Sequence, residues 1–303
     1  MAEILSQEDA RYVFDLCIEA GAKAVQMREG VDISTKSHAD DLVTGADKAL
    51  SEMLVSRLQE RFPEDTVLSE EAPWQSEDNG KRRWIIDPID GTKYYVDGSG
   101  KYCVMVGLVV NGKEAFGAVY MPQQEVGFYG GPSMGCYAYK DKAVTKLSSA
   151  QGQEVIVWPA GDASGPSKKL RMLVSKNDLK ANDWLEKLET VEIVTASSIG
   201  FDVYELHLGL ADIFVHIRPT LGYWDTAASG AVAQGMGYEV GTEADDSLTY
   251  GFVSPKHLPH VVIGKPGSLT VWREIFKQHQ AQSQAQTPAQ APAQTPASAP
   301  ADQ

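Results

Sequence analysis

The sequence predicts a protein of mixed α and β structure in two domains, an α+β half followed by an α/β half. The first half contains short strand-like segments between residues 102 and 139, separated by turn signals such as Asn111-Gly112, which is the pattern of an antiparallel meander. In the second half, strand-like and helix-like segments alternate from residue 171 to residue 236. In a chain of 303 residues, 43% are apolar, which is sufficient for a core of this size.

The N-terminal domain, residues 1–150, is expected to begin with two amphipathic helices. Ser6 can cap the first helix, and the apolar residues after it recur at helical spacing. The second helix follows Asp47 and ends near Phe62. Short segments rich in β-forming residues come next in the chain. They are TVLSEE, RWIID, YCVMVGLVV, EAFGAVYM, EVGFYG and GCYAY.

A change in composition around WPAGDASGPSKK places a domain boundary near residues 145–168. In the C-terminal domain, residues 151–279, the strand-like segments RMLVS, VEIVT and ADIFVHI alternate with helices. These helices are expected around Asp183–Leu188, Asp202–Gly209 and Asp225–Met236. Residues 280–303 consist almost wholly of Gln, Ala, Pro, Ser and Thr. Such a segment buries too little apolar surface to offset its ordering entropy, so we expect a disordered tail.

The charge balance limits the partners that the chain can have. With 41 acidic and 27 basic residues the net charge is −14, so we expect neither a nucleic-acid polymer nor a membrane as a partner. Cys17, Cys103 and Cys136 fit neither a disulfide framework nor a zinc pattern, which indicates buried thiols in a reducing compartment. The chain lacks the pattern of a signal peptide or a membrane span, so the expected location is the cytoplasm.

Acidic residues lie beside strand-like or aromatic segments in four places. They are Asp47 in GADKA, Glu70 and Glu71 in LSEEAPW, Asp87 and Asp90 in DPIDGT, and Asp225 in YWDTAASG. Taken singly, each has an ordinary alternative, because Asp47 and Asp225 can act as helix N-caps and Glu71 can be a solvated surface acid. Taken together, half-buried carboxylates are costly unless they are paired or bound to a cation.

A hard divalent cation such as Mg²⁺ prefers oxygen ligands, and a pair of cations needs a shared carboxylate. Asp87 and Asp90 lie on one short turn, where Pro88 constrains the chain and can direct the intervening carbonyl inward. Gly91 then leaves the amide of Thr92 and its neighbour available to a phosphate oxygen, especially if a helix begins there. The pattern therefore favours a magnesium site that handles a phosphate.

These motifs resemble those of the inositol monophosphatase superfamily, which comprises magnesium-dependent, lithium-inhibited phosphomonoesterases. The chain contains DDLVTGAD, SEEAPW, WIIDPIDGT and YWDTAASG in the order of the family, across roughly residues 10–265. The resemblance implies a layered α-β-α-β-α sandwich, with a mostly antiparallel N-terminal sheet domain and a C-terminal α/β domain. Because the family often forms dimers, it also implies a homodimer. The chain departs from the last motif at Ser229, where the family has Gly, which affects the expected helix packing near Asp225.

The resemblance also assigns roles to individual residues. It implies that Glu70, Asp87 and the Ile89 carbonyl hold one Mg²⁺, that Asp87, Asp90 and Asp225 hold a second, and that Glu70 can contact a third. In the family's mechanism a metal-bound water attacks the phosphorus. Here that water would be oriented by Glu70 and by Thr92, whose hydroxyl is held by Asp47.

Within the superfamily, the residues around the motifs are closest to those of the 3'(2'),5'-bisphosphate nucleotidases. Lys93 follows the D-G-T of the strand motif, and Arg218 in IRPT stands where those enzymes contact the second phosphate or the base. The reaction implied is removal of the 3'-phosphate of adenosine 3',5'-bisphosphate, giving AMP and phosphate. The implied substrate contacts are Asp90, Gly91, Thr92, Lys93, Ser198 and Arg218.

Two departures favour other phosphate esters. Ser198 is followed three residues later by Phe201 rather than by the Lys of the nucleotidases, and VSKNDL has Asn177 in place of a His. Inositol-1-phosphate and histidinol-phosphate are therefore retained as alternative substrates. Phe201 can stack on an adenine ring or belong to the core. Arg218 can instead form an ordinary ion pair, and Lys36 can lie in a loop that closes over the site.

A protein that senses metal or phosphate without turnover is the alternative from another functional class. Such a sensor would keep the fold and could signal through the C-terminal tail. The presence of Glu70, Asp87, Asp90, Thr92 and Asp225 argues against it, because a sensor has no need of residues that orient a water.

Overall fold

The structure is a computed structural model that describes residues 4–28, 33–35, 42–73, 82–148, 155–156, 169–251, 254–257 and 260–286. Most of the first half forms a seven-stranded sheet with the order β3-β4-β5-β6-β7-β8-β9. The β3–β4 pair is parallel and the other neighbours are antiparallel, so the sheet is mostly antiparallel as predicted. Its strands are β3 Thr66–Ser69, β4 Arg82–Asp90, β5 Cys103–Val110, β6 Lys113–Met121, β7 Val126–Gly131, β8 Gly135–Lys140 and β9 Ala143–Lys146.

The second half forms a five-stranded sheet with the order β11-β10-β12-β14-β13. The strands β11, β10 and β12 are parallel, as the alternating pattern predicted, whereas β14 is antiparallel to both of its neighbours. The strands are β10 Leu170–Val174, β11 Val191–Thr195, β12 Ile213–His216, β13 Glu239–Gly241 and β14 Val261–Gly264. A short hairpin, β1 Ile33–Thr35 with β2 Leu42–Thr44, lies apart from both sheets.

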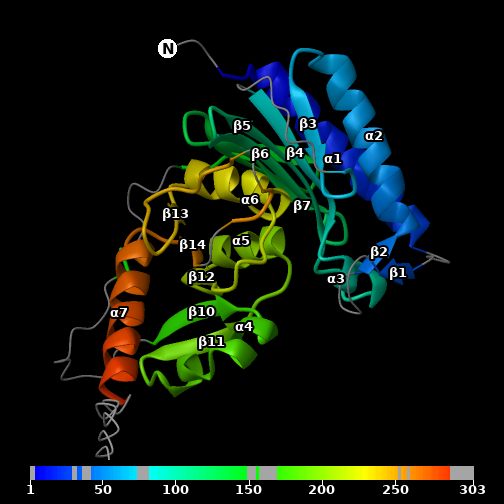
Figure 1. The fold of residues 1–303 in the computed structure, drawn as a ribbon. Helices are drawn as coiled ribbons and strands as arrows, with labels where there is room; N and C mark the ends of the chain where they lie inside the picture. Colours follow the sequence, from blue (N-terminus) through cyan, green and yellow to red (C-terminus); the bar gives the residue numbers. More distant parts are fainter. Residues whose placement is uncertain are drawn as a thin grey trace, which may run out of the picture.

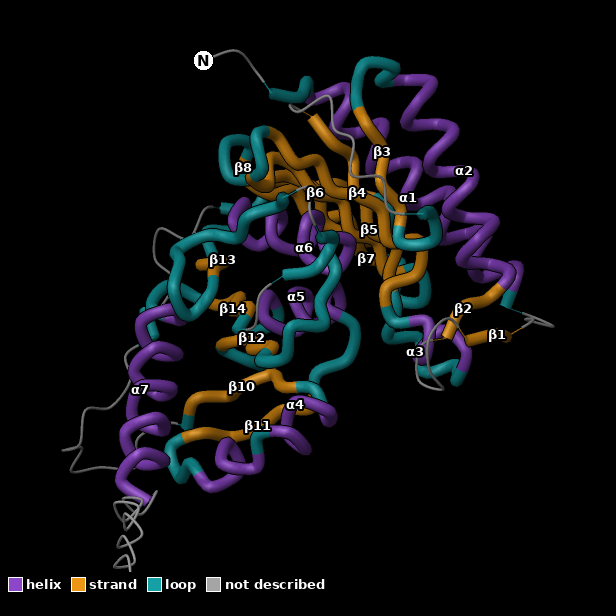
Figure 2. Tube along the Cα trace, viewed as in Figure 1, coloured by secondary structure: helices purple, strands orange, loops and turns teal. Residues whose placement is uncertain are grey.

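The helices complete five layers, which confirms the predicted α-β-α-β-α sandwich (Figure 1). α1 and α2 cover one face of the seven-stranded sheet, and α5 and α6 lie between the two sheets (Figure 2). The 3₁₀ helix η1 and α7 cover the outer face of the five-stranded sheet. The bounds are α1 Gln7–Met27, α2 Gly45–Arg61, α3 Thr92–Val96, α4 Lys176–Ala181, η1 Asp183–Lys187, α5 Ile199–His207, α6 Tyr223–Gly235 and α7 Ser268–Gln286.

Local signals set several helix boundaries differently from the sequence prediction. Ser6 caps α1 as expected, accepting a hydrogen bond from the Asp9 amide at 3.1 Å. The cap of α2, however, is Thr44, and Asp47 occupies the third helical position of a capping box. The helix expected around Asp183–Leu188 is a short 3₁₀ turn that follows the separate helix α4.

The C-terminal helix α7 continues through Gln286, so the first residues of the segment expected to be disordered are helical. Gln and Ala support a helix, and the first proline of the segment, Pro288, comes only after the end of α7. The rest of that segment lies outside the described residues. Among the residues that are described, no helix combines the length and apolar character needed to cross a membrane. Cys17, Cys103 and Cys136 are free and buried, as expected.

A close approach between α6 and the seven-stranded sheet fixes the middle layer. Gly107 and Gly117 lie opposite each other in the β5–β6 pair. A Cβ on Gly107 would lie 2.7 Å from the backbone of Ala227, and one on Gly117 would overlap the backbone of Ala228. Two glycines facing two alanines therefore let the helix backbone rest directly on the sheet. This contact sets the height of the start of α6 above the sheet.

The buried acid Glu114 generates a prediction about stability. Its carboxyl lies between β6 and α6, and burial raises its pKa to about 7 despite hydrogen bonds that lower it. A raised folded-state pKa means that stability is fully present below the unfolded-state pKa and is lost as the pH rises through about 7. We therefore expect the free energy of unfolding of the native chain to decrease from pH 5 to pH 8. The decrease should be about 2 kcal/mol larger than in Glu114→Gln, which lacks the titrating carboxyl.

Urea unfolding at the two pH values measures this difference, with Glu52→Gln on the exposed side of α2 as the control. The control should keep the pH dependence of the native chain. Identical pH dependence in Glu114→Gln and the native chain would contradict the assignment of this effect to Glu114.

Candidate active site

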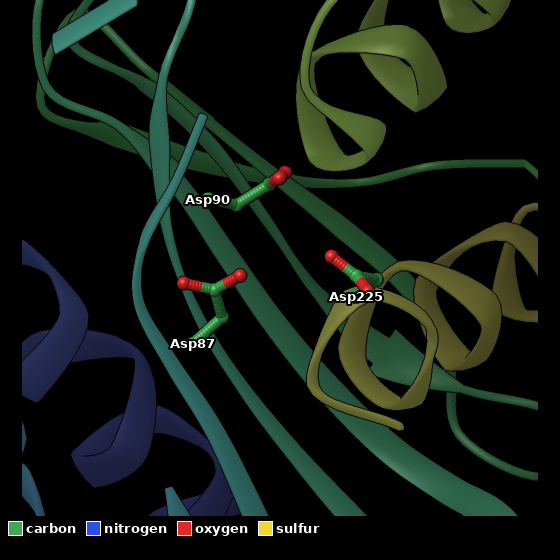
Figure 3. A group of neighbouring side chains, drawn as sticks. All are labelled: Asp87, Asp90 and Asp225. Carbon is green, nitrogen blue, oxygen red and sulfur yellow. The ribbon is translucent and has the colours of Figure 1, made fainter. Parts of the chain in front are cut away.

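Three carboxylates, from two distant parts of the chain, meet at the end of β4. Asp87 and Asp90 lie on that strand, and Asp225 lies in the first turn of α6. One carboxylate oxygen from each lies within 4.8 Å of the other two (Figure 3). Asp87 and Asp90 are buried, with only 2% and 5% of their surfaces exposed. The structure thus brings together the aspartates that the sequence analysis assigned to one metal.

The end of β4 is shaped so that both of its aspartates can face the same place. Its pairing with β5 is regular up to Asp87 and resumes at Asp90 with a shift in register. Pro88 lies within the shift and has no amide proton to donate to the neighbouring strand. The Asp87 carboxylate accepts a hydrogen bond from the Ile89 amide at 3.1 Å, which stabilises this turn.

The electrostatics of the cluster favour a bound cation. Burial first, and then the negative charges of Glu70, Asp90, Asp225 and Asp47, raise the pKa of the Asp87 carboxyl well above its usual range. Glu70 follows β3, and its amide donates to the Ile86 carbonyl at 3.1 Å, which ties it to the strand that carries Asp87. Buried like charges are unfavourable unless protons or a cation neutralise them. A set of carboxylate oxygens is also the ligand type that Mg²⁺ prefers.

Thr92 makes the contact expected from the sequence. Its hydroxyl oxygen lies 3.2 Å from the Asp47 Oδ1 atom and 3.2 Å from the Ile89 carbonyl oxygen. The other carboxylate oxygen of Asp47 accepts hydrogen bonds from the Thr44 amide at 2.8 Å and from the Thr44 hydroxyl. Asp47 is therefore held by the start of α2 while it faces Thr92. The backbone of Gly91, with a φ of 87°, turns the chain from β4 into α3.

Asp90 has partners that the sequence analysis missed. Its Oδ2 atom accepts a hydrogen bond from the Gly200 amide at 2.8 Å and one from the Cys103 thiol at 3.2 Å. Burial raises the pKa of the Asp90 carboxyl, and these bonds, with the Ile199 amide, offset part of that effect. Gly200 lies in the first turn of α5, so the second half of the chain directly positions a carboxylate of the first. No sequence motif links Gly200 to Asp90, because the two positions are 110 residues apart.

Asp225 is held by the start of its own helix. Its Oδ2 atom accepts a hydrogen bond from the Gly222 amide at 2.5 Å. Asp225 is thus at the third position of α6 rather than at the N-cap. Ser229, the departure from the family motif, donates its hydroxyl proton to the Asp225 carbonyl at 2.6 Å. The serine fits in the buried first turns of α6 and satisfies its own hydroxyl there.

The residues expected to contact the substrate have different surroundings. Ser198 lies just before α5 and is 3% exposed. A Cβ on Gly91 would lie 2.7 Å from the Ser198 Cβ, so these two residues are neighbours. Lys93 is exposed on α3. Lys36 lies outside the described residues.

Arg218 forms an ion pair with a buried acid. Its Nε donates to the Asp178 Oδ1 atom at 3.0 Å, and about 33% of the Arg218 side chain is exposed. Asp178 also faces the His216 Nδ1 atom at 3.0 Å and accepts from the Ser175 hydroxyl at 2.6 Å. Burial raises the pKa of Asp178, but hydrogen bonds from His216 and Ser175 and the charge of Arg218 outweigh this effect. They hold the pKa of Asp178 well below its usual range. Arg218, Asp178 and His216 lie at the carboxyl ends of the parallel strands β10 and β12.

Phe201 belongs to the core rather than to an open surface. It is 7% exposed, packs edge-on against Tyr204, and lies under the Lys101 ammonium group, which is 5.3 Å from the ring centre. Of the two interpretations of this residue, the structure supports the core position.

Comparison with known proteins shows the family to which the chain belongs. The sequence model of the inositol monophosphatase family matches residues 7–280. The chain belongs to this family. It is therefore a metal-dependent phosphoric monoester hydrolase, as the motifs implied.

Relatives named for different activities resemble the chain to a similar degree. The 3'(2'),5'-bisphosphate nucleotidase CysQ of Shigella flexneri is 30% identical over 257 residues, which are 80% of this chain and 96% of the relative. Inositol monophosphatase 1 of Sus scrofa is 26% identical over 238 residues, which are 76% of this chain and 82% of the relative. The nucleotidase resemblance seen in the motifs is thus also present across most of the sequence.

A solved structure shares the fold. An IMPase/NADP phosphatase in complex with Mg²⁺ and phosphate aligns with a TM-score of 0.67 at 20% identity, over 89% of this chain and 95% of its own. At this identity the match supports the architecture, with its two sheets and the helices between them.

The contact between Gly200 and β5 generates a second prediction. A Cβ on Gly200 would overlap the Cys103 thiol and lie 2.9 Å from the Met105 sulfur, so alanine there forces α5 away from Asp90. We expect Gly200→Ala to lower the free energy of unfolding by about 2 kcal/mol, because overpacking a buried contact typically costs 1–3 kcal/mol. Gly45→Ala is the matched control, since a Cβ on this helical glycine meets nothing within 4 Å. Urea denaturation measures both variants, and equal stabilities would contradict the close contact.

Proposed function

We propose that this phosphatase removes the 3'-phosphate of adenosine 3',5'-bisphosphate, giving AMP and inorganic phosphate, with two or three Mg²⁺ ions as cofactors. Water supplies the oxygen that replaces the ester oxygen on phosphorus, and the 3'-hydroxyl leaves with a proton. The observation that carries the hydrolytic part is the convergence of Asp87, Asp90 and Asp225 within 4.8 Å at a buried strand end. The nucleotide part is supported by the CysQ relatives and by the residues shared with the nucleotidases.

The residues present suit the cations that the family implies. Asp87, Asp90 and Asp225 would hold one ion, and Asp87, Glu70 and the Ile89 carbonyl another. When bound, the ions would neutralise the carboxylates and the phosphate and supply a water whose pKa is lowered by several units. This local positive charge also accounts for how a chain with a net charge of −14 can bind an anionic substrate.

Thr92 and Asp47 would orient the attacking water. The Thr92 hydroxyl has one proton, and its two neighbouring acceptors are Asp47 Oδ1 and the Ile89 carbonyl oxygen, each at 3.2 Å. A cation on the Ile89 carbonyl would leave Asp47 as the acceptor of that proton. The lone pairs of Thr92 Oγ1 could then accept a hydrogen bond from the attacking water, which would fix the direction of the water oxygen.

Asp90→Asn tests the catalytic cluster. The amide keeps the size of the side chain and an oxygen that can accept from the Gly200 amide, but it removes the negative charge. We expect release of phosphate to fall at least a thousandfold, while circular dichroism and the midpoint of thermal unfolding stay close to those of the native chain. Asp97→Asn, at the exposed end of α3, should retain full activity. Unchanged turnover in Asp90→Asn would reject the site.

Arg218 is the residue that we propose to bind the second phosphate of the substrate. Its Nε is committed to Asp178, which leaves the terminal nitrogens of the guanidinium group as candidates for a phosphate contact. The ion pair with a buried aspartate would also fix the orientation of the side chain, so that little rotamer entropy is lost on binding. Ser198 and Lys93 are proposed as further contacts near Gly91.

A comparison of two nucleotides isolates this contribution. Arg218→Met should lower kcat/KM for adenosine 3',5'-bisphosphate about tenfold or more, because a charge-assisted hydrogen bond contributes about 1.5–3 kcal/mol. It should change kcat/KM for 3'-AMP, which lacks the 5'-phosphate, by less than threefold. Phosphate release from both nucleotides and from inositol-1-phosphate and histidinol-phosphate is the measurement. Equal rates of the native chain on all of these esters would contradict a nucleotide substrate.

Inositol-1-phosphate is the second candidate substrate, favoured by the Sus scrofa relative. The pairing of Arg218 with Asp178 supports it as well, because the ion pair already neutralises part of the charge that a second phosphate would need. A preference of the native chain for this ester in the same panel would select it.

A further inference from the structure

A short segment outside the carboxylate cluster holds the start of α6 on both sides of Asp225. The Tyr223 amide donates to the Pro255 carbonyl at 2.7 Å, and the His257 amide donates to the Leu221 carbonyl at 3.0 Å. A β-bridge joins Gly222 to Lys256. We call residues 254–257 the clamp segment. Its backbone contacts cover the residues immediately before Asp225.

The clamp segment also contacts the residue immediately after Asp225. The His257 Nε2 atom and the Thr226 hydroxyl form a short hydrogen bond. Thr226 is fully buried and His257 is 7% exposed, so water does not compete readily for this bond. Burial lowers the pKa of His257 to about 4, which keeps the imidazole neutral near pH 7 and able to share a proton with the hydroxyl.

The Thr226 hydroxyl has a second hydrogen-bond partner, Tyr250. The Tyr250 hydroxyl donates to it at 3.2 Å. The rings of Tyr223, Tyr250 and His257 contact one another, with centre-to-centre distances of 5.0 Å for Tyr223–Tyr250, 4.8 Å for Tyr223–His257 and 5.1 Å for Tyr250–His257. The link to the clamp segment and the link to Tyr250 are thus separate bonds on one oxygen atom, and they can be removed one at a time.

We propose that His257, acting through Thr226, is a positioning residue that sets where the Asp225 carboxylate lies relative to Asp87 and Asp90, and so sets the affinity of the site for divalent cations. The proposal rests on the proposed function of the carboxylate cluster. Asp225 comes from α6, whereas Asp87 and Asp90 come from β4, so the distance between them depends on how the first turn of α6 is held. Contacts behind metal ligands commonly change affinity by 10–100-fold when removed.

Binding of Mn²⁺ to the full chain without substrate tests this role. Free Mn²⁺ is followed by its electron paramagnetic resonance signal, and Mg²⁺ is added as a competitor. Thr226→Val keeps the shape of the side chain and removes both hydrogen bonds, and His257→Leu removes only the bond from the clamp segment. We expect each to raise the dissociation constant of Mn²⁺ about tenfold. In the double variant the dissociation constant of Mn²⁺ should also rise only about tenfold over the native value, because both changes remove the same hydrogen bond.

Two further variants separate positioning from general damage. His257→Gln can place a hydrogen-bonding group near the position of Nε2 and should restore most of the affinity. Tyr250→Phe removes the Tyr250–Thr226 hydrogen bond and leaves the His257–Thr226 hydrogen bond in place. The dissociation constant of Mn²⁺ for this variant should therefore stay within about twofold of the native value. In Thr226→Val, the Mg²⁺ concentration for half-maximal phosphate release should rise about tenfold, while kcat at saturating Mg²⁺ changes less than threefold.

The outcomes distinguish this proposal from the proposed function. If Asp225→Asn loses Mn²⁺ binding while Thr226→Val and His257→Leu bind it as the native chain does, the positioning role is wrong and the metal site stands. The positioning role of His257 would also be wrong if Tyr250→Phe lost as much Mn²⁺ affinity as Thr226→Val. If the native chain binds neither Mn²⁺ nor Mg²⁺, the proposed function fails and the positioning role fails with it.

Discussion

Mutual repulsion among buried carboxylates is the constraint on which the rest of the structure depends. Asp87 and Asp90 lie almost out of reach of water, with Asp225 beside them and the charges of Glu70 and Asp47 close enough to raise the pKa of Asp87. A fold does not hold such a group for its own stability, because each uncompensated charge is unfavourable in the interior. The surrounding elements therefore act as supports that keep the carboxylates at separations suited to a shared cation.

Each carboxylate has its own support, and the supports come from different layers. The Asp90 side chain receives the Gly200 amide from the first turn of α5. The height of Asp225 is set where the Ala227 and Ala228 backbone rests on Gly107 and Gly117. Since the glycines belong to the first half of the chain and the alanines to the second, the cluster exists only when both halves are folded against each other. The middle helical layer is thus the element that assembles the site.

The residues that we propose for contact with the second phosphate of the substrate depend on different physics. At the carboxyl ends of β10 and β12, Asp178 and His216 are buried, and Arg218, which pairs with Asp178, is partly exposed. The free energy of an ionic interaction made by a partly exposed cation depends on its partners and on how much of it the substrate shields from water. The chain resembles a nucleotidase and an inositol phosphatase to a similar degree, so overall similarity does not select the phosphate ester.

The sequence by itself indicated a mostly antiparallel first half, an alternating α/β second half and the ligand candidates Asp87, Asp90 and Asp225, because these features depend on local patterns. The layered sandwich and the pairing of Thr92 with Asp47 followed from the resemblance of its spaced motifs to those of a family. Only the tertiary structure decided which groups support the ligands. The Gly200–Asp90 bond joins positions 110 residues apart, and the His257–Thr226 bond joins positions 31 residues apart. It also paired Arg218 with Asp178. Such contacts leave no local periodicity, since they arise from how closely packed layers bring particular atoms within bonding distance.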